Sequence, residues 1–247
     1  MNLRVAVAGV TNGLGHTIVS ALLDSPNLEV NLLTRISSSP TDLYHLTSHS
    51  AIAKPVNYTP IPSLESALAG LILARRFAPS EFAMSRAADA RLDLYEPKRQ
   101  VWAALKDSKL EYTSFQNGIF MDYFTFGTPK QHEGLLKVFL SVVNLVAAKA
   151  IVPGTGNEKV TFTTIVNIGR LLLLRFNWMG DGRIITGRKL DVEYMDVEAI
   201  KRALRASKWD LMQFFYHQVS QLLAEGLGTV TPTLNRLSPH ITVTSAR

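Results

Sequence analysis

The stretch from Leu3 to Arg35 constrains the fold most. Leu3 to Ala8 is a short, almost wholly apolar run without a helical stripe, typical of a strand buried on both faces of a parallel sheet. Gly9 to Gly15 follows at once, and apolar residues then recur at helical spacing until Asp24 to Pro26. With a second strand at 29–34, this order predicts the first unit of a doubly wound, Rossmann-type α/β fold.

The glycine turn has the properties of a phosphate site. Gly9 and Gly15 lack side chains, so a pyrophosphate can approach the backbone and the helix can pack on the strand. Asn12 replaces the middle glycine, and asparagine is among the few other residues that tolerate a positive φ. We predict a dinucleotide-binding loop; the alternative is a turn that serves packing alone. The predicted cofactor-binding residues of the loop are Gly9, Thr11, Asn12, Gly13, Leu14 and Gly15.

Arg35 bears on the choice of cofactor. It ends the second strand 20 residues after Gly15, where an NAD-selective site places an acidic residue for the ribose 2′-hydroxyl. A guanidinium suits a 2′-phosphate instead, so Arg35 favours NADP(H), the alternative being an exposed arginine at a strand end. Ser37 to Ser50 is predicted to be a loop near the adenine end.

Composition excludes several classes of protein. The net charge of +6 is spread along 247 residues without a basic, aromatic patch, so no nucleic-acid partner is expected. The chain has no cysteine, which excludes thiolate catalysis and fits a cytoplasmic location. Polar residues interrupt the apolar run Leu135 to Val152, which therefore predicts a buried or partner-facing helix and no membrane span. Histidine spacing indicates no metal site.

The middle of the chain supplies candidate site residues. Ala51 to Tyr58 is a weak third strand, and 62–69 a short helix. The turn after Phe77 places Ser80 and Glu81 at the carboxyl edge of the sheet, where sites of α/β proteins lie. They are predicted to contact the substrate.

A helix is predicted over Tyr95 to Lys106, with Lys98 one turn inside it. Its inner side is predicted to carry Val101, Trp102 and Leu105. The aromatic stretch that follows the strand Glu111 to Phe115 either belongs to the core or lines a substrate pocket. Its candidate pocket residues are Asn117, Phe120 and Tyr123. Further on, a strand at 159–163 and helical segments at 165–176 and 197–225 are predicted.

Four segments, in this order, resemble the NmrA-like branch of the atypical short-chain dehydrogenases, which includes isoflavone reductase-like enzymes. They are the Gly9 to Gly15 loop, Arg76 to Phe82, Tyr95 to Lys98 with Tyr112 to Asp122, and Ile151 to Asn157.

The resemblance implies a Rossmann domain that binds NADP(H), a small C-terminal substrate lobe, and reduction of small aromatic or polyketide-like molecules. It also implies that Lys98 contacts the cofactor and is the catalytic residue. By itself, a lysine early in a helix is a solvated surface residue. Tyr95 is expected to pack against the helix start rather than act as an acid.

Two departures accompany the resemblance. Between Gly70 and Leu71 one βα unit of the family is missing, so Leu71 to Ala78 is predicted to lie beside Leu3 to Ala8. A family helix is missing near Ile185. We expect an NADP-binding domain over 1–130 and a substrate lobe over 131–247.

The leading functional hypothesis is an NADPH-dependent oxidoreductase for a small organic substrate, in specialised metabolism. The alternatives are a non-catalytic NADP-binding regulator of the NmrA type, which would bind a protein partner, and a shortened inactive paralogue.

Overall fold

The structure, a computed structural model, describes residues 3–59, 61–68, 76–126, 136, 143–174, 191–230 and 244–246. The chain divides into two compact units, and each is described by itself. The first comprises 1–74, 132–137 and 165–181. The second comprises 75–131, 138–164 and 182–247. The predicted boundary at residue 130 stays a prediction.

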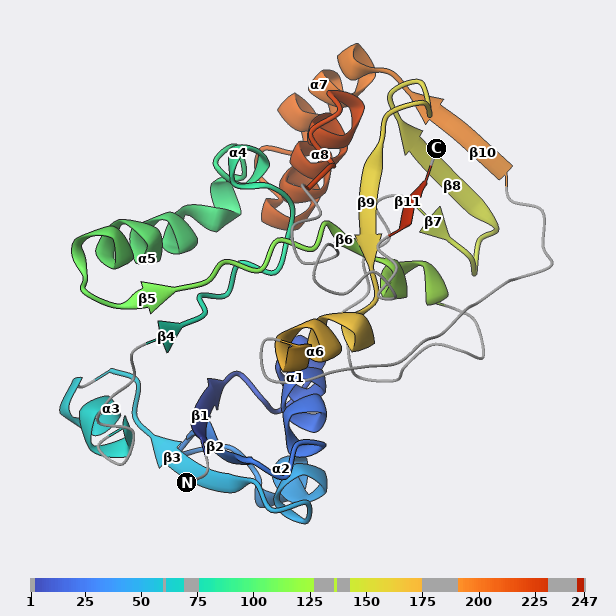
Figure 1. The fold of residues 1–247 in the computed structure, drawn as a ribbon. Helices are drawn as coiled ribbons and strands as arrows, with labels where there is room; N and C mark the ends of the chain where they lie inside the picture. The colour runs from blue at the N-terminus through green and yellow to red at the C-terminus, as the bar shows by residue number, and fades with distance from the viewer. Residues whose placement is uncertain are drawn as a thin grey trace. The chain divides into compact units, whose positions relative to one another are not determined.

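The first unit is built on a parallel sheet of three strands in the order β1-β2-β3 (Figure 1). The strands are β1 (Leu3–Ala8), β2 (Leu28–Arg35) and β3 (Ile52–Val56). Ala8 pairs with Leu33, and Arg35 pairs with Val56. The α/β class is therefore confirmed. Among the described strands β3 lies at the edge of this sheet, as its proline predicted, because a proline has no backbone N–H to donate to a neighbouring strand.

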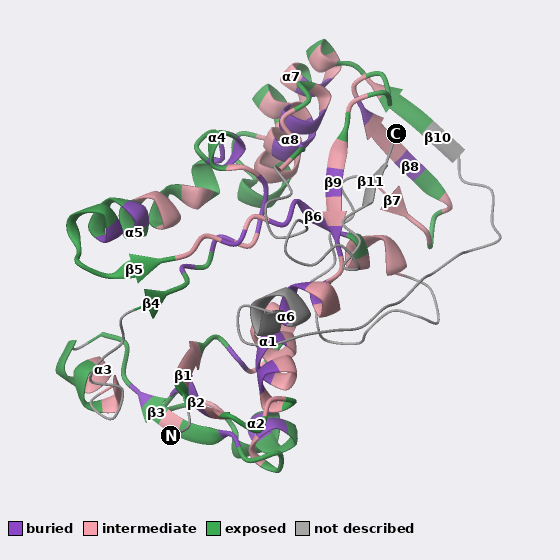
Figure 2. Cartoon of the chain, viewed as in Figure 1, coloured by how far each residue is buried: buried purple, intermediate pink, exposed green. Residues whose placement is uncertain are grey.

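The helices of this unit are α1 (Gly13–Leu23), α2 (Pro40–Thr47), α3 (Ile61–Leu68) and α6 (Ile165–Leu174). α1 packs against α6, and its buried face joins the apolar residues of β2, drawn in purple in Figure 2. The prediction that Ser37 to Ser50 is a loop was wrong, because it contains α2. The hydroxyl of Ser39 accepts a hydrogen bond from the Thr41 amide at 3.2 Å, and Leu43 and Leu46 bury one side of the helix.

The second unit begins with the parallel pair β4 (Arg76–Phe77) and β5 (Glu111–Tyr112). Between these strands lie α4 (Arg86–Asp89), η2 (Asp93–Tyr95) and α5 (Glu96–Asp107). The expectation that Leu71 to Ala78 pairs with β1 was wrong for its described part. Arg76 and Phe77 pair with β5, because the α5 crossover returns the chain to β4. The rest of the segment lies outside the described residues.

The remaining strands of this unit form two sheets, β10-β8-β7 and β11-β9-β6. They are β6 (Ile119–Phe120), β7 (Val143–Asn144), β8 (Lys149–Pro153), β9 (Val160–Thr163), β10 (Asp191–Met195) and β11 (Thr244–Ala246). The helix predicted over Leu135 to Val152 was wrong where that segment is described. β7 and β8 are antiparallel, joined by a turn in which Ala148 has a φ of 53° and the Asn144 side chain accepts from the Ala147 amide.

Further helices complete this unit: η3 (Met121–Thr125), α7 (Val197–Ala206) and α8 (Leu211–Ala224). Asp210 separates the last two, because its carboxylate caps α8 by accepting from two amides. The core joins the end of α4 to α8. Its buried members are Met84, Ala88, Leu92, Ile119, Val219, Leu222 and Leu223.

The inner face of α5 was predicted in part. Trp102 and Leu105 are buried, as expected, but Val101 is 43% exposed. The helical spacing of Trp102 and Leu105 leaves Val101 a quarter-turn outside the stripe.

Candidate functional site

The glycine turn has the close packing that a dinucleotide loop requires. A Cβ at Gly15 would lie 2.1 Å from the carbonyl oxygen of Gly9, so α1 can begin this close to β1 only with glycine there. Gly9 itself has a φ of 73°, and a Cβ there would meet nothing within 4 Å. The turn therefore combines a tight backbone with open space beside it.

The N-terminus of α1 offers amides. Asn12 is the N-cap residue, yet its side chain makes no capping hydrogen bond, and the first turn holds no acidic residue. The first N–H groups of a helix have no partner within the helix, so an anion fits here. The idea that Asn12 uses a positive φ was wrong. Its φ is −156°, and Gly13, with a φ of 62°, takes the left-handed conformation instead.

Arg35 lies at the same sheet edge as the turn. Because Ala8 pairs in parallel with Leu33, Arg35 lies two residues beyond the end of β1, level with the start of the glycine turn. Its side chain is exposed. The position at the strand end is thus as predicted, and it is compatible with a 2′-phosphate ligand.

Sequence reasoning missed Tyr58. It follows β3, and its hydroxyl donates to the Leu33 carbonyl at 2.8 Å. Burial raises the pKa of Tyr58, and the positive charge of Arg35 opposes that rise, which places the two side chains in one electrostatic neighbourhood. The signal was present, because parallel strands end at one edge and the residues after β3 therefore lie beside Arg35.

The second unit contains a cavity of about 400 Å³ along one side of α5. Its charged and aromatic lining includes Glu81, Arg86, Asp89, Tyr95, Lys98, Arg99, Trp102, Lys106 and Asp107. The cavity is thus lined by one predicted pocket residue, Glu81, and by the predicted catalytic residue, Lys98. It also contains Asp89, which the sequence analysis did not select.

Lys98 is half-buried in this cavity. Its Nζ lies 4.0 Å from the centroid of the Tyr95 ring, a cation–π contact. Burial lowers the pKa of the ammonium, and the charges of Asp89 and Glu81 oppose that effect. A buried ammonium of lowered pKa gives up its proton more readily than a surface lysine does.

Tyr95 supports Lys98 through its ring. Burial, with the charge of Asp89 next, raises the pKa of its phenol well above the usual range, so the phenol stays neutral. The ring also packs against Phe215, with centroids 5.8 Å apart. Tyr95 has the packing contacts that were expected of it.

The other predicted pocket residues lie outside the wall of this cavity. Ser80 is exposed. The Asn117 amide donates to the Ala83 carbonyl at 3.0 Å, and the side chain of Asn117 is buried. Phe120 is buried with its ring edge-on to Tyr123, at 6.0 Å between centroids. Phe120 therefore has the environment of a core residue.

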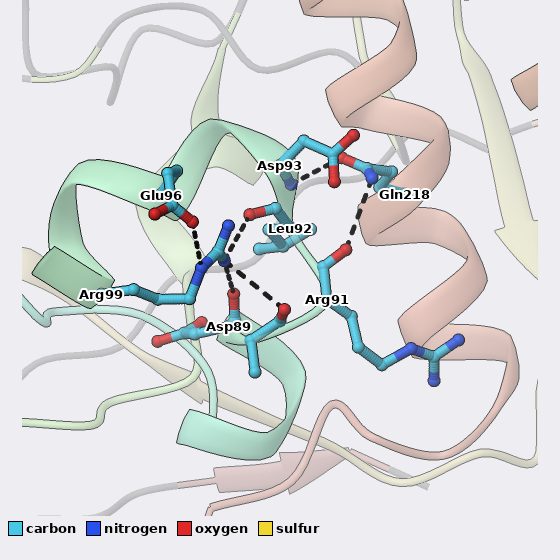
Figure 3. Close-up of polar contacts among 8 residues, drawn as sticks. Asp89, Arg91, Leu92, Asp93, Glu96, Arg99 and Gln218 are labelled. Carbon is cyan, nitrogen blue, oxygen red and sulfur yellow. Dashed lines mark hydrogen bonds and ion pairs between the residues drawn. The ribbon is translucent and has the colours of Figure 1, made fainter.

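Arg99 holds the two helices of the cavity together. Figure 3 shows its guanidinium directed at the chain between α4 and η2. Nη1 donates to the carbonyl oxygens of Asp89 at 3.2 Å and Leu92 at 2.9 Å, while Nε is 2.7 Å from the Glu96 carboxylate. The backbone of Asp89 is thereby fixed to the helix that carries Lys98.

Two absences concern the described part of the chain. There, no three histidine or acidic side chains are arranged to hold a metal ion. The helices found in the same ranges are too short or too polar to cross a bilayer.

The chain is similar to known oxidoreductases. No protein-family model matches it. Oxidoreductase BOA1 of Botryotinia fuckeliana is 26% identical over 239 residues, covering 83% of this chain and 77% of that protein. Oxidoreductase aprR of Aspergillus flavus is 26% identical over 247 residues, covering 82% and 80%.

Solved structures give the same fold. Leucoanthocyanidin reductase of Vitis vinifera, in a binary complex with NADPH, superposes with a TM-score of 0.67 at 16% identity, covering 98% of this chain and 96% of that one. The NADPH-dependent quinone oxidoreductase QOR2 of Escherichia coli has a TM-score of 0.68 at 17% identity and the same coverage. The chain therefore has a Rossmann-type fold.

Proposed function

We propose that this protein is an NADPH-dependent oxidoreductase that reduces a small aromatic or polyketide-like molecule, with Lys98 as its catalytic residue. The observation that carries the proposal is the half-buried Lys98 ammonium, which contacts the Tyr95 ring and lines one cavity with Glu81 and Asp89. A surface lysine has no such surroundings.

The residues of the first unit fit NADP(H). Gly9, Gly13 and Gly15 leave the backbone and the uncapped N-terminus of α1 open to a pyrophosphate. Arg35 would bind the 2′-phosphate, and Tyr58 offers a half-exposed ring beside it. Bound NADPH would supply the hydride.

The protein must supply the proton and the orientation. In the reduction of a carbonyl group, the Lys98 ammonium would donate its proton to the substrate oxygen, leaving a neutral amine that solvent reprotonates. The Tyr95 ring would hold the ammonium in place through the reaction. Glu81, which lines the cavity with Lys98, is the proposed substrate contact there. Ser80, Asn117, Phe120 and Tyr123, which lie outside the cavity wall, stay predictions.

The comparisons support this proposal. Both curated relatives are named oxidoreductases, and the two solved structures are NADPH-binding reductases of the same fold. A role in specialised metabolism and the atypical short-chain dehydrogenase subtype belong to the same proposal.

Cofactor binding is the first test. Fluorescence titration of the purified protein with NADPH and NADH should show tighter binding of NADPH, because only NADPH carries the 2′-phosphate. Absence of binding to either cofactor would overturn the proposal.

Turnover is the second test. NADPH absorbance would be followed against a panel of enones, quinones and aryl ketones, and oxidation coupled to reduction of at least one member is expected. Tight NADPH binding without turnover on the whole panel would favour the non-catalytic regulator over the reductase.

A further inference from the structure

The carboxylate of Asp89 is buried without a hydrogen-bond partner among the described residues. Its side chain is only 7% exposed and lines the α5 cavity, yet neither of its two oxygens has a hydrogen-bond partner in the described part of the chain. Burying a carboxylate without hydrogen bonds is unfavourable and is seldom tolerated without a compensating role. The fold therefore maintains this group at a cost.

The backbone around Asp89 explains how it is held there. Ser85 caps the short helix α4 by accepting a hydrogen bond from the Ala88 amide at 3.3 Å. Nη1 of Arg99 donates to the carbonyl oxygen of Asp89, the last residue of α4, and to that of Leu92, which precedes η2 (Figure 3). The Arg99 guanidinium donates to these carbonyl oxygens and to the Glu96 carboxylate. It makes no hydrogen bond to the carboxylate of Asp89.

The charged groups around this carboxylate come from three elements. Glu81 comes from the segment after β4, Arg86 from α4 itself, and Lys98 and Arg99 from α5. The Arg86 guanidinium stacks 3.4 Å from the centroid of the Trp102 ring, and Arg99 is engaged as described. Lys106 and Asp107 also line the cavity, and Tyr95 stays a neutral phenol.

The pKa shifts of Asp89 and Lys98 agree with an electrostatic coupling between the two side chains. Burial raises the pKa of Asp89 to about 7, the charge of Lys98 opposes that rise, and Glu81 adds to it. Asp89 in turn opposes the lowering of the Lys98 pKa. Each group therefore responds to the charge of the other near neutral pH.

We propose that Asp89 is a positioning residue for Lys98: its unpartnered carboxylate, held beside α5 by Arg99, is the charge that keeps the Lys98 ammonium protonated inside the cavity. When Asp89 is ionised, Lys98 holds its proton more firmly. When Asp89 is neutral, Lys98 releases it more easily. The catalytic meaning of this coupling rests on the proposed reductase function, but the coupling itself does not.

Competitive labelling measures the coupling without any substrate. The protein would be treated with trace acetic anhydride at pH 5.5 to 8.5, and acetylation of Lys98 would be read by peptide mass spectrometry against an added model amine. Only the neutral amine reacts, so the logarithm of the rate rises with unit slope against pH while a lysine is mostly protonated. In the wild type, the slope should fall below one around pH 7, where Asp89 ionises.

Asp89→Asn should restore unit slope. At pH 8.5 the variant should label Lys98 about 5- to 50-fold faster than the wild type, the effect of removing one nearby charge. At pH 5.5 the two rates should agree, because Asp89 is then neutral in the wild type. Asp93→Asn is the matched control: it removes an exposed carboxylate four residues away and should leave the Lys98 profile unchanged.

A ratio of variant to wild-type rate that stays constant across the pH range would overturn the proposal. If Asp89→Asn does not fold, the slope of the wild-type labelling profile decides by itself. A unit slope over the whole pH range in the wild type would also overturn the proposal. With an active substrate, the pH profile of kcat should lose an inflection near 7 in Asp89→Asn. Failure to find any turnover would overturn the proposed function, while the labelling result would still decide the coupling.

Discussion

The Nζ atom of Lys98 lies 4.0 Å from the centroid of the Tyr95 ring, three residues earlier in the chain. The contact spans the junction of η2 and α5, because Tyr95 ends the first element and Glu96 begins the second. It holds the ammonium on the cavity side of α5, where a substrate can reach it.

Replacement of Lys98 tests its catalytic role. Lys98→Ala should lower turnover by about 100- to 10,000-fold, the span for a positioned proton-transfer group, with a smaller effect on NADPH affinity. Lys98→Arg should rescue little, because a guanidinium keeps its proton and has a different shape. Steady-state kinetics and NADPH titration measure the two effects. Unchanged turnover in Lys98→Ala would remove Lys98 from the mechanism.

Replacement of Arg35 tests the choice of cofactor. Arg35→Ala should weaken NADPH binding by about 1.5–3 kcal/mol, the value of a hydrogen bond to a charged group, and leave NADH binding unchanged. Arg4→Ala is the control. Arg4 forms an ion pair with Glu29 at 3.2 Å near the opposite end of the same strands. Its replacement should therefore leave the affinity for both cofactors unchanged. Equal weakening of both cofactors in Arg35→Ala would show that Arg35 supports the fold instead.

Gly15 tests the packing of the turn. A Cβ there would meet the Gly9 carbonyl oxygen at 2.1 Å, so Gly15→Ala must shift the backbone of α1 or β1. We expect a loss of about 1–3 kcal/mol in the free energy of unfolding, together with weaker NADPH binding. Gly9→Ala provides the contrast, because its Cβ would meet no atom and only the left-handed backbone, at about 1–2 kcal/mol, opposes it. Urea unfolding distinguishes them, and an unaffected Gly15→Ala would contradict the close approach.

Asp89 makes stability depend on pH. Its folded pKa of about 7 lies above the ordinary value of 3.8, so its contribution to the free energy of unfolding is fully present below pH 3.8 and is lost as the pH rises from there through 7. Asp89→Asn should therefore be more stable than the wild type at pH 8, by about 1–3 kcal/mol, and the gain should shrink toward pH 4. Urea unfolding at several pH values measures this. The same gain at pH 5 and pH 8 would refute it.

The strands and helices around the glycine turn could be read from the sequence because their signals are local. The apolar run of β1, the glycines and the helical spacing of α1 each concern neighbouring residues, and the parallel register then places Arg35 at the same edge. Where a segment suits both a helix and a strand, the prediction from the sequence was wrong. Leu135 to Val152 is as apolar as a helix core, yet its described part pairs as β7 and β8, because hydrogen bonding to another strand outweighs helix propensity there.

The surroundings of Lys98 were decided only by tertiary structure. The segment Tyr95 to Lys106 predicted the helix, and only the family resemblance selected Lys98 within it. Neither gave a sign of Asp89, an acid in a short helix whose pattern resembles a surface turn. Asp89 is buried beside Lys98 because Arg99 binds the carbonyl oxygens at the end of α4 and the core closes over Ala88 and Leu92. The charge state of a lysine depends on which groups surround it in space, and only the packing of α4 against α5 determines that.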